Sequence, residues 1–213
     1  MNPEREGDTR RDSAALADGV ALWLLRHGET EWSRSGRHTS VTDLPLTAEG
    51  ERQAAALATH FAAMRPALVL TSPRQRAVHT ARLAGLRPDG VDADLAEWNY
   101  GEYEGRTSAE IRTEVPGWTL FTHGALGGES ADQVAARADR VLSRACAALA
   151  RGPVVLVGHG HFSRVLGARW IGLRATAAAN LLLDAAALCL LSAQHGAPAL
   201  KRWNLSTPNN EGD

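Results

Sequence analysis

Three short apolar runs constrain this sequence more than any other feature. They lie at about residues 20–27, 68–71 and 154–157, and each is followed by a polar residue or a glycine. Short continuous apolar runs with such boundaries are typical of strands that are buried on both faces of a sheet. Helical patterns occur between and after the runs, so the alternation predicts an α/β fold in which helices cover the sheet.

The predicted helices have clear start signals. Thr47 is a suitable N-cap for one helix, and Pro73 suits the first turn of another. Ser130 and Gln133 have the spacing of a capping box that opens a long amphipathic helix. The predicted helices span about residues 48–64, 74–84, 108–115, 131–150 and 162–171.

Three later segments predict short strands, which we expect to pair antiparallel at a sheet edge. They lie at about residues 180–183, 187–193 and 199–203. All the elements together predict a three-layer αβα sandwich around one mixed, mostly parallel sheet with antiparallel edge strands. We expect a single domain at residues 19–206, preceded by a flexible leader at 1–18 and followed by a flexible tail at 207–213.

Residues 98–128 have an irregular pattern in which aromatic side chains alternate with glycines and charges. Long connections without a regular pattern often border or gate a functional site. We therefore expect a short insert that covers one edge of the sheet. Its aromatic residues are Trp98, Tyr100, Tyr103, Trp118 and Phe121.

Composition argues against several classes of protein. The 213 residues have a formal net charge of −1, so no overall positive field favours nucleic acid or a membrane surface. No apolar stretch has the length of a transmembrane helix, and residues 1–18 are too polar for a signal peptide. Cys146 and Cys189 are expected to be buried free thiols. We therefore expect a cytoplasmic protein.

Residues that can bind an anion follow all three apolar runs. Arg26 and His27 end the first run. Arg74 follows the second run, and His159 follows the third. The carboxyl ends of parallel strands meet at one edge of a sheet, where α/β proteins bind ligands. Because paired arginines clamp phosphate oxygens and a neutral histidine can attack phosphorus, the pattern predicts a phosphate site.

The motifs around these residues resemble the histidine phosphatase superfamily, in its phosphoglycerate-mutase-like branch. They occur in the family's order, and the resemblance covers about residues 20–203. It implies an enzyme of this fold that needs neither a metal nor a cofactor. The motifs are Leu25-Arg-His-Gly-Glu-Thr30, Thr71-Ser-Pro-Arg-Gln-Arg-Ala77, Leu95-Ala-Glu-Trp-Asn-Tyr-Gly-Glu-Tyr-Glu-Gly105 and Gly158-His-Gly-His161.

The resemblance implies catalytic roles for five residues. His27 would be the nucleophile and would form a phosphohistidine. Arg26, Arg74 and His159 would bind the phosphoryl oxygens and stabilise the charge of the transition state. Glu97 matches the family's proton donor, which protonates the leaving alcohol and then activates water.

Other positions match substrate-binding stretches of the family. Thr39 lies where a hydroxyl approaches the phosphate, and Ser33 stands where many relatives have asparagine. Gly160 offers a backbone amide, since glycine allows close approach. His123 is a further candidate for substrate contact. His161 either faces the pocket or begins the following helix.

Hydrolysis is favoured over phosphoryl transfer. Mutases of the family resemble one another in a longer insert that carries lysine and paired arginines. Here only about thirty residues separate Glu97 from Ser130, with Arg106 and Arg112 but no lysine. The sequence resembles small acid phosphatases and sedoheptulose-bisphosphatase-like members of the family. We predict a metal-independent phosphomonoesterase for a small metabolite such as a sugar phosphate.

Several alternatives stay open. The chain could catalyse phosphoglycerate mutase-type transfer, or dephosphorylate protein phosphohistidine or phosphotyrosine. It could also be a non-enzymatic module that binds a phospho-ligand or a protein. The two histidines at 159 and 161 could hold a metal, although no carboxylate–histidine set accompanies them. We expect a small phosphorylated partner, no nucleic acid and no membrane, and we leave a homodimer open.

Overall fold

The computed structural model describes residues 16–206. Most of the predicted leader and the whole predicted tail lie outside the described residues. Residues 16–18 at the end of the predicted leader are attached to the domain. Leu16 packs against the main core, and the Asp18 carboxylate accepts a hydrogen bond from the Gly196 amide at 2.9 Å.

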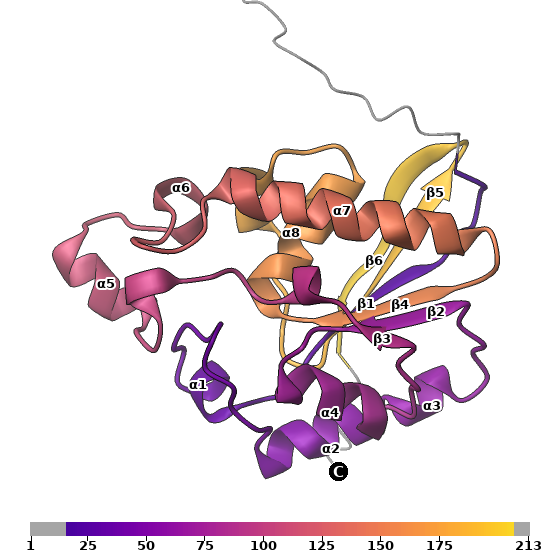
Figure 1. The fold of residues 1–213 in the computed structure, drawn as a ribbon, viewed down its shortest axis with the longest axis horizontal. Coiled ribbons are helices and arrows are strands. Elements are labelled where there is room, and N and C mark those ends of the chain that lie inside the picture. The colour runs from indigo at the N-terminus through magenta and orange to yellow at the C-terminus, as the bar shows by residue number, and fades with distance from the viewer. Residues whose placement is uncertain (1–15, 207–213) are drawn as a thin grey trace, which may run out of the picture.

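One six-stranded sheet organises the molecule, in the order β3-β2-β4-β1-β5-β6 (Figure 1). The pairs β1–β4, β2–β4 and β2–β3 are parallel, whereas β1–β5 and β5–β6 are antiparallel. This confirms the predicted mixed sheet with antiparallel strands at one edge. The strands are β1 Leu22–Arg26, β2 Leu68–Thr71, β3 Gly90–Val91, β4 Val154–Gly158, β5 Leu188–Gln194 and β6 Ala197–Leu205.

Helices cover both faces of the sheet, as a three-layer sandwich requires. In Figure 1, α2, α3 and α4 lie on one side of the strands, and α7 and α8 lie on the other. Thr47 caps α2, and Ser130 with Gln133 forms the capping box of α7, as predicted. The helices are α1 Glu31–Arg34, α2 Ala48–Ala56, α3 Ala58–Phe61, α4 Gln75–Leu83, α5 Ser108–Glu114, α6 Leu120–His123, α7 Ala131–Leu149 and α8 Gly160–Trp170.

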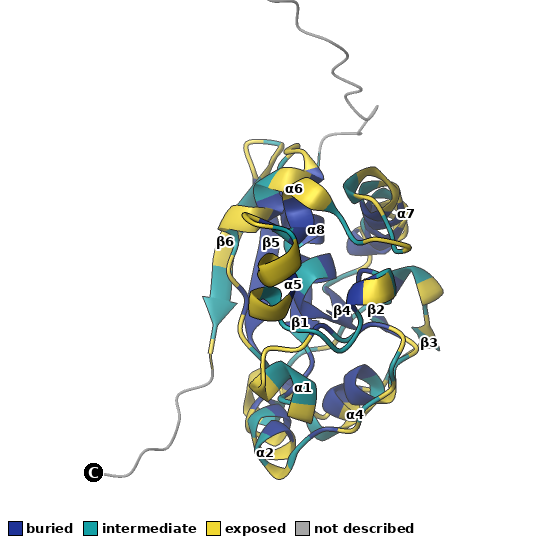
Figure 2. Ribbon diagram, turned by 90° about the vertical axis from the view of Figure 1, so that its left-hand side faces the viewer, coloured by how far each residue is buried: buried dark blue, intermediate teal, exposed yellow. Residues whose placement is uncertain are grey.

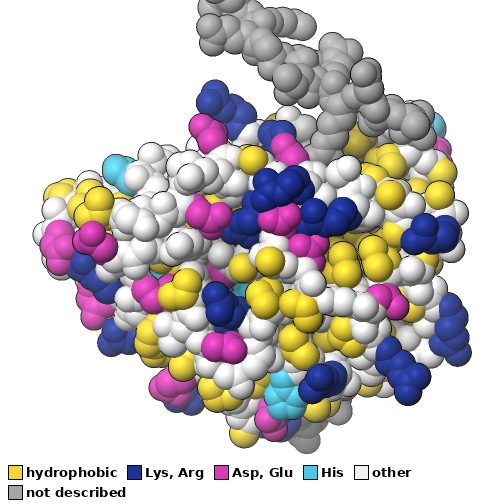
Figure 3. Space-filling view, in the orientation of Figure 1, with side chains coloured by type: hydrophobic (Ala, Val, Ile, Leu, Met, Phe, Trp, Pro, Cys, Tyr) yellow, Lys and Arg dark blue, Asp and Glu magenta, His cyan; other side chains and the backbone are white. Residues whose placement is uncertain are grey.

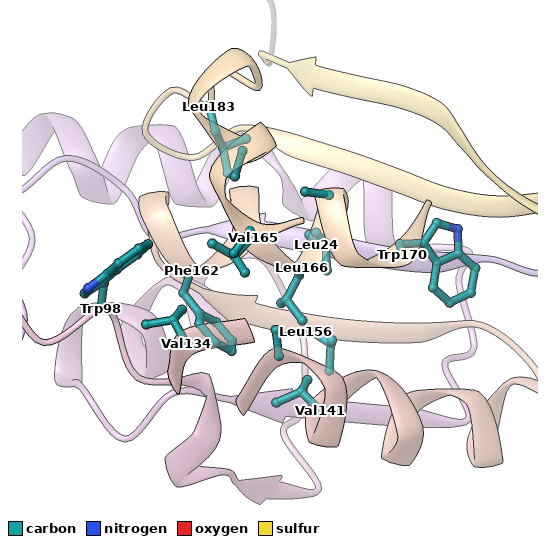
Figure 4. Packing of buried hydrophobic residues seen from close by; sticks show 14 of the residues in the cluster. Leu24, Trp98, Val134, Val141, Leu156, Phe162, Val165, Leu166, Trp170 and Leu183 are labelled. Carbon is teal, nitrogen blue, oxygen red and sulfur yellow. The ribbon is translucent and has the colours of Figure 1, made fainter. Parts of the chain in front are cut away.

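The hydrophobic core has two parts, one on each face of the sheet. Successive side chains of a strand point to opposite sides of a sheet. Leu22 and Leu24 of β1 therefore pack with α7 and α8, whereas Trp23 and Leu25 pack with Leu57, α3 and α4. Figure 4 shows the first of these clusters, in which the labelled side chains of α7, α8 and the strands lie against one another.

Two predicted elements differ from the structure. The helix predicted at 48–64 is divided at Leu57, whose amide bonds to the Ala54 carbonyl three residues back, as in a tightened 3₁₀ turn. The strand predicted at 180–183 is absent: a 3₁₀ helix at Ala175–Asn180 leads into an irregular segment. Its apolar pattern has another cause, since Leu183 is buried in the core while Leu182 is exposed.

The aromatic segment forms the expected cover. Residues 98–128 contain α5 and α6, which Figures 1 and 2 both place beyond one end of the central strands. The cover is packed rather than open, because its five aromatic side chains are all buried. The Tyr100 hydroxyl lies 2.7 Å from the His161 Nδ1 atom, so the cover reaches the residues that follow β4.

The surface carries mixed charge around α7. In Figure 3, basic and acidic side chains alternate on this face. Arg140 and Arg144 of α7 pair there with Asp94, and Arg144 also pairs with Asp92. Among the described residues, no helix has the length and hydropathy needed to cross a membrane.

Candidate active site

His27 lies at the end of β1, directly under the edge where the parallel strands finish. Its side chain is buried, and its backbone amide bonds to the Gly158 carbonyl at the end of β4. The His27 Nδ1 atom is 2.7 Å from the Gly28 carbonyl oxygen. Because a carbonyl oxygen can only accept, Nδ1 carries the proton and Nε2 keeps its lone pair.

The surroundings of His27 favour its neutral form. Burial lowers the pKa of His27 well below its usual value, and the nearby charges of Arg76 and Arg26 lower it further. A neutral imidazole with its Nε2 lone pair free is a nucleophile. The strand end therefore holds a histidine in a reactive tautomer.

His159 faces His27 from the neighbouring strand end. It follows β4 and is the N-cap residue of α8, and its ring centre lies 5.1 Å from that of His27. Its Nε2 atom is 2.7 Å from the Ser72 hydroxyl oxygen, while its buried Nδ1 atom has no hydrogen-bond partner among the described residues. Burial is also the main reason why the pKa of His159 is well below its usual value.

Three arginines at this edge have a buried donor without a protein acceptor. The Nε atoms of Arg26, Arg74 and Arg76 have no hydrogen-bond partner in the described part of the chain. Buried donors without a partner are rare in folded proteins, and each one needs an explanation. Three guanidinium groups with this property at one sheet edge fit a site for an anion.

Arg76 was missed by the sequence prediction, which selected Arg74 from the same motif. Arg76 is fully buried, and its charge affects the pKa of both His27 and His159 more than that of Arg26 does. Arg74 lowers the pKa of His159 less than Arg26 does. Helix periodicity places Arg76 on the same face of α4 as Thr80, four residues later, but only the packing of α4 shows that this face is the buried one.

Arg76 also organises the loop that follows α1. Its Nη atoms donate to the carbonyl oxygens of Thr39, Ser40 and Thr42. From the other side, the Glu104 carboxylate accepts from the backbone amides of Ser40 and Thr42. Thr39 is thus held at the site through its backbone, while its hydroxyl bonds to the Arg37 carbonyl.

Glu97 is a buried carboxylate at the N-terminus of α8. Its Oε1 atom accepts from the backbone amides of Trp98 and Phe162, each at 2.8 Å. Its Oε2 atom accepts from the His161 amide at 3.0 Å. Helix N-termini favour negative charge through their free amide groups. These bonds fix the Glu97 carboxylate one residue from the Gly160 backbone.

Gly160 and His161 both belong to the site region. A Cβ atom on Gly160 would lie 3.3 Å from the Cζ atom of Arg26, so only glycine leaves this close approach unhindered. The helix begins at Gly160 rather than at 162, and the His161 ring contacts the cover. Its Nδ1 atom lies 2.7 Å from the Tyr100 hydroxyl, and its ring packs near His38 and Phe121.

Two predicted contact residues have other partners in the structure. The Ser33 hydroxyl oxygen accepts from the Thr30 amide and belongs to the capping box of α1. His123 is exposed at the end of α6, where its Nδ1 atom lies 2.8 Å from the Thr122 hydroxyl. No group of three or more potential metal ligands occurs among residues 16–206.

Comparison with known proteins identifies the family. Residues 22–206 match the histidine phosphatase superfamily (branch 1). The chain belongs to this superfamily. Its fold and its enzyme class, a phosphatase, are therefore those that the motifs predicted.

The chain is similar to characterised and solved members of the family. It is 41% identical over 177 residues to an acid phosphatase of Mycobacterium tuberculosis, and the aligned region covers 82% of this chain and 87% of that protein. It is 34% identical to sedoheptulose 1,7-bisphosphatase of Saccharomyces cerevisiae, over 70% of this chain and 67% of that protein. A solved Mycobacterium tuberculosis structure superposes with a TM-score of 0.86 at 39% identity, covering 89% and 99% of the two chains.

Proposed function

We propose that this protein is a metal-independent phosphomonoesterase that hydrolyses a small phosphorylated metabolite, such as a sugar phosphate, through a phosphohistidine. One observation carries the proposal. The buried His27 keeps its Nε2 lone pair free because Nδ1 donates to the Gly28 carbonyl, and unpartnered arginine donors lie at the same edge. A cytoplasmic location is a further prediction from the sequence, which leaves a homodimer open.

In the first step, the Nε2 atom of His27 attacks phosphorus. The N–P bond forms while the bond from phosphorus to the ester oxygen breaks. Arg26 and Arg76 stabilise the charge on the phosphoryl oxygens, with Arg74 at the rim and His159 as a further hydrogen-bond donor. The arginine Nε donors and the Nδ1 atom of His159 thereby obtain acceptors.

Glu97 transfers the proton in both steps. It protonates the leaving ester oxygen as the alcohol departs, and then takes a proton from the water that attacks the phosphohistidine. The second attack breaks the N–P bond and releases inorganic phosphate, which regenerates His27. Of the two carboxylate oxygens, Oε2 accepts one backbone bond and Oε1 accepts two, so Oε2 is the better placed to carry the proton.

The cover supports hydrolysis over mutase-type transfer. A mutase has to hold a second anionic group of its substrate, and Arg106 and Arg112 are the arginines available between Glu97 and Ser130. Both are engaged: Arg106 pairs with the Glu114 carboxylate, and the Arg112 Nε atom donates to the Trp118 carbonyl. The small-metabolite class is supported by the packed cover and by the similarity to sedoheptulose 1,7-bisphosphatase.

The decisive test is the loss of activity and of the covalent intermediate in one variant. His27→Ala is expected to abolish hydrolysis of 4-nitrophenyl phosphate, and ³²P from a labelled substrate should remain bound only to the wild-type chain. His79→Ala, an exposed histidine on α4, is the control and should retain activity. Turnover by His27→Ala, or label on that variant, would overturn the proposal.

A substrate panel then separates the related activities. Sugar phosphates, aryl phosphates, phosphotyrosine peptide and 3-phosphoglycerate with its bisphosphate are compared, with and without a chelator. Release of phosphate from sugar phosphates at a rate unaffected by the chelator is expected. Isomerisation of phosphoglycerate without net phosphate release would instead establish mutase activity, and binding without turnover would establish a non-enzymatic module.

A further inference from the structure

Arg137 is a buried arginine of α7 that lies behind the segment carrying Glu97. It follows Val134 of the same helix by one turn, and its guanidinium stacks 4.3 Å from the ring centre of Phe162. Figure 4 shows Trp98, Val134 and Phe162 gathered at this end of the core. Within residues 16–206, the hydrogen bonds, ion pair and ring contact of Arg137 involve none of the residues proposed to bind phosphate, so the proposed reaction leaves it without a role.

All five N–H groups of Arg137 have acceptors. Nη1 donates to the Asp94 and Ala96 carbonyl oxygens, each at 2.7 Å. Nη2 donates to the Glu97 carbonyl oxygen at 3.4 Å and to the Glu129 carboxylate at 2.8 Å, and Nε donates to the other oxygen of Glu129 at 2.9 Å. A guanidinium has five donors in a rigid plane, so every one is used to hold this segment.

Glu129 bonds to the residues after Glu97, and together with Arg137 it forms a clamp on this segment. Its carboxylate accepts from the Asn99 amide, and its backbone carbonyl accepts from the Trp98 indole nitrogen, both at 2.8 Å. Its backbone amide donates to the Asn99 carbonyl at 2.9 Å. The Arg137–Glu129 pair therefore fixes the main chain on both sides of Glu97.

The clamp and α8 hold Glu97 from opposite ends. Arg137 binds the Glu97 main chain, while the Phe162 amide binds its carboxylate. The same Phe162 carries the ring that lies under the guanidinium. A displacement of Arg137 therefore changes both the main chain of Glu97 and the helix end against which its carboxylate rests.

We propose that the Arg137–Glu129 pair is a positioning device for proton transfer by Glu97, an inference that rests on the proposed function. A proton donor must lie within hydrogen-bond distance of the leaving oxygen, and small displacements reduce the rate strongly. Arg137 and Glu129 act through Glu97 and do not contact the substrate. Their contribution is specific to substrates whose leaving group needs a proton.

The test compares an alkyl phosphate with an aryl phosphate. A sugar alkoxide departs poorly without a proton, whereas 4-nitrophenolate departs readily. The measured quantity is kcat/KM, which covers only the steps up to cleavage of the ester bond. Arg137→Lys keeps the charge but has three donors in place of five, so it is expected to lower kcat/KM for glucose 6-phosphate about tenfold or more and to change that for 4-nitrophenyl phosphate less than about threefold.

The matched control lies one turn further along α7. Arg140 is exposed and pairs with the Asp94 carboxylate instead of the backbone carbonyls. Arg140→Lys is expected to leave the ratio of the two kcat/KM values unchanged. Glu129→Gln, which removes the charge of the partner, should shift the ratio in the same direction as Arg137→Lys, and it decides the matter if Arg137→Lys does not fold.

A double variant separates positioning from a general structural effect. In a Glu97→Gln background, Arg137→Lys should cause no further change in the alkyl-to-aryl ratio, because the donor is already lost. An equal loss with both substrates, or an undiminished further loss in the double variant, would overturn the inference. If the wild type hydrolyses neither substrate, or Glu97→Gln lowers both equally, the proposed function or the role of Glu97 fails instead.

Discussion

At the residue scale, the tautomer of His27 decides which of its atoms can react. The Gly28 carbonyl fixes the proton on Nδ1, and burial together with Arg76 and Arg26 keeps the ring neutral. A charged ring would have no lone pair to offer phosphorus. The same two arginines that depress the pKa of the free histidine would attract the phosphate dianion, so one arrangement serves both attack and binding.

The two arginines of the second motif should differ in importance. Arg76 is fully buried against the histidines, while Arg74 is only partly buried at the start of α4. Arg76→Lys is expected to reduce kcat/KM for 4-nitrophenyl phosphate by about a hundredfold, the loss typical of a transition-state donor. Arg74→Lys should reduce it less than about tenfold, because Arg74 is only partly buried and solvent screens its charge. The reverse order in steady-state kinetics would contradict the assignment of Arg76.

The role of Glu97 as proton donor should appear in how strongly kcat/KM depends on the leaving group. Glu97→Gln keeps an oxygen that can accept backbone bonds but supplies no carboxylic proton. Its kcat/KM is expected to fall by about a hundredfold or more for a sugar phosphate and by less than about tenfold for 4-nitrophenyl phosphate. Steady-state kinetics with a series of phenols and alcohols as leaving groups measures the trend. A slope identical to that of the wild type would rule out Glu97 as the proton donor.

At the element scale, α2 supports the loop that carries His27 by close backbone contact. A Cβ atom on Gly28 would lie 2.3 Å from the Gly50 carbonyl oxygen, and Cβ on Gly50 would lie 2.1 Å from the Glu29 carbonyl oxygen. The Gly28 amide also donates to the Thr80 hydroxyl of α4. Two helices, α2 and α4, thus hold the end of β1. The contact with α2 requires glycine at both Gly28 and Gly50.

Gly50→Ala is therefore expected to disturb stability and activity together. The methyl group overlaps backbone, which has no flexible side chain to move aside, so α2 must shift from the loop. Overpacking of this kind costs roughly 1–3 kcal/mol of unfolding free energy. Urea unfolding and aryl-phosphate turnover are the measurements. Ala56→Ser on the exposed face of α2 is the control and should stay within about 0.5 kcal/mol; a Gly50→Ala variant as stable as this control would contradict the close contact.

At the scale of the whole molecule, buried neutral histidines should make the fold sensitive to acid. Burial lowers the pKa of His38 to about 4, and it places the pKa values of His27, His159 and His161 well below the usual value. A histidine with a lowered pKa binds a proton in the unfolded chain before the folded one. Stability is therefore complete above the unfolded pKa near 6.5 and decreases as the pH falls toward the folded pKa.

One substitution measures the contribution of His38 to this acid sensitivity. Each such histidine contributes a slope of up to about 1.4 kcal/mol per pH unit between its two pKa values. His38→Gln is expected to be less stable at pH 7 but to lose less stability between pH 6.5 and 4.5 than the wild type. Urea unfolding over this pH range gives the slopes, with the exposed His79→Gln as the control. Equal slopes for wild type and His38→Gln would contradict the burial of a neutral ring.

Local sequence patterns determined the central strands and the main helices, and they indicated which residues meet at the strand ends. The apolar runs, the capping residues Thr47 and Ser130, and the residues at the strand ends all have signals within a few positions of one another. Parallel pairing then brings the strand ends to one edge without further information. Arg26, His27 and His159 could therefore be placed together from the sequence, and the structure does bring them together.

Only the tertiary structure distinguished residues whose local patterns are alike. Arg74 and Arg76 are two positions apart, and the packing of α4 decided which one is buried beside the histidines. Residues 180–183 read as a strand, but Leu183 packs into the core and its carbonyl accepts from Arg26, 157 positions away. The clamp of Arg137 joins residues about forty positions apart. Bonds over such separations depend on how whole elements pack, and no short stretch of sequence records them.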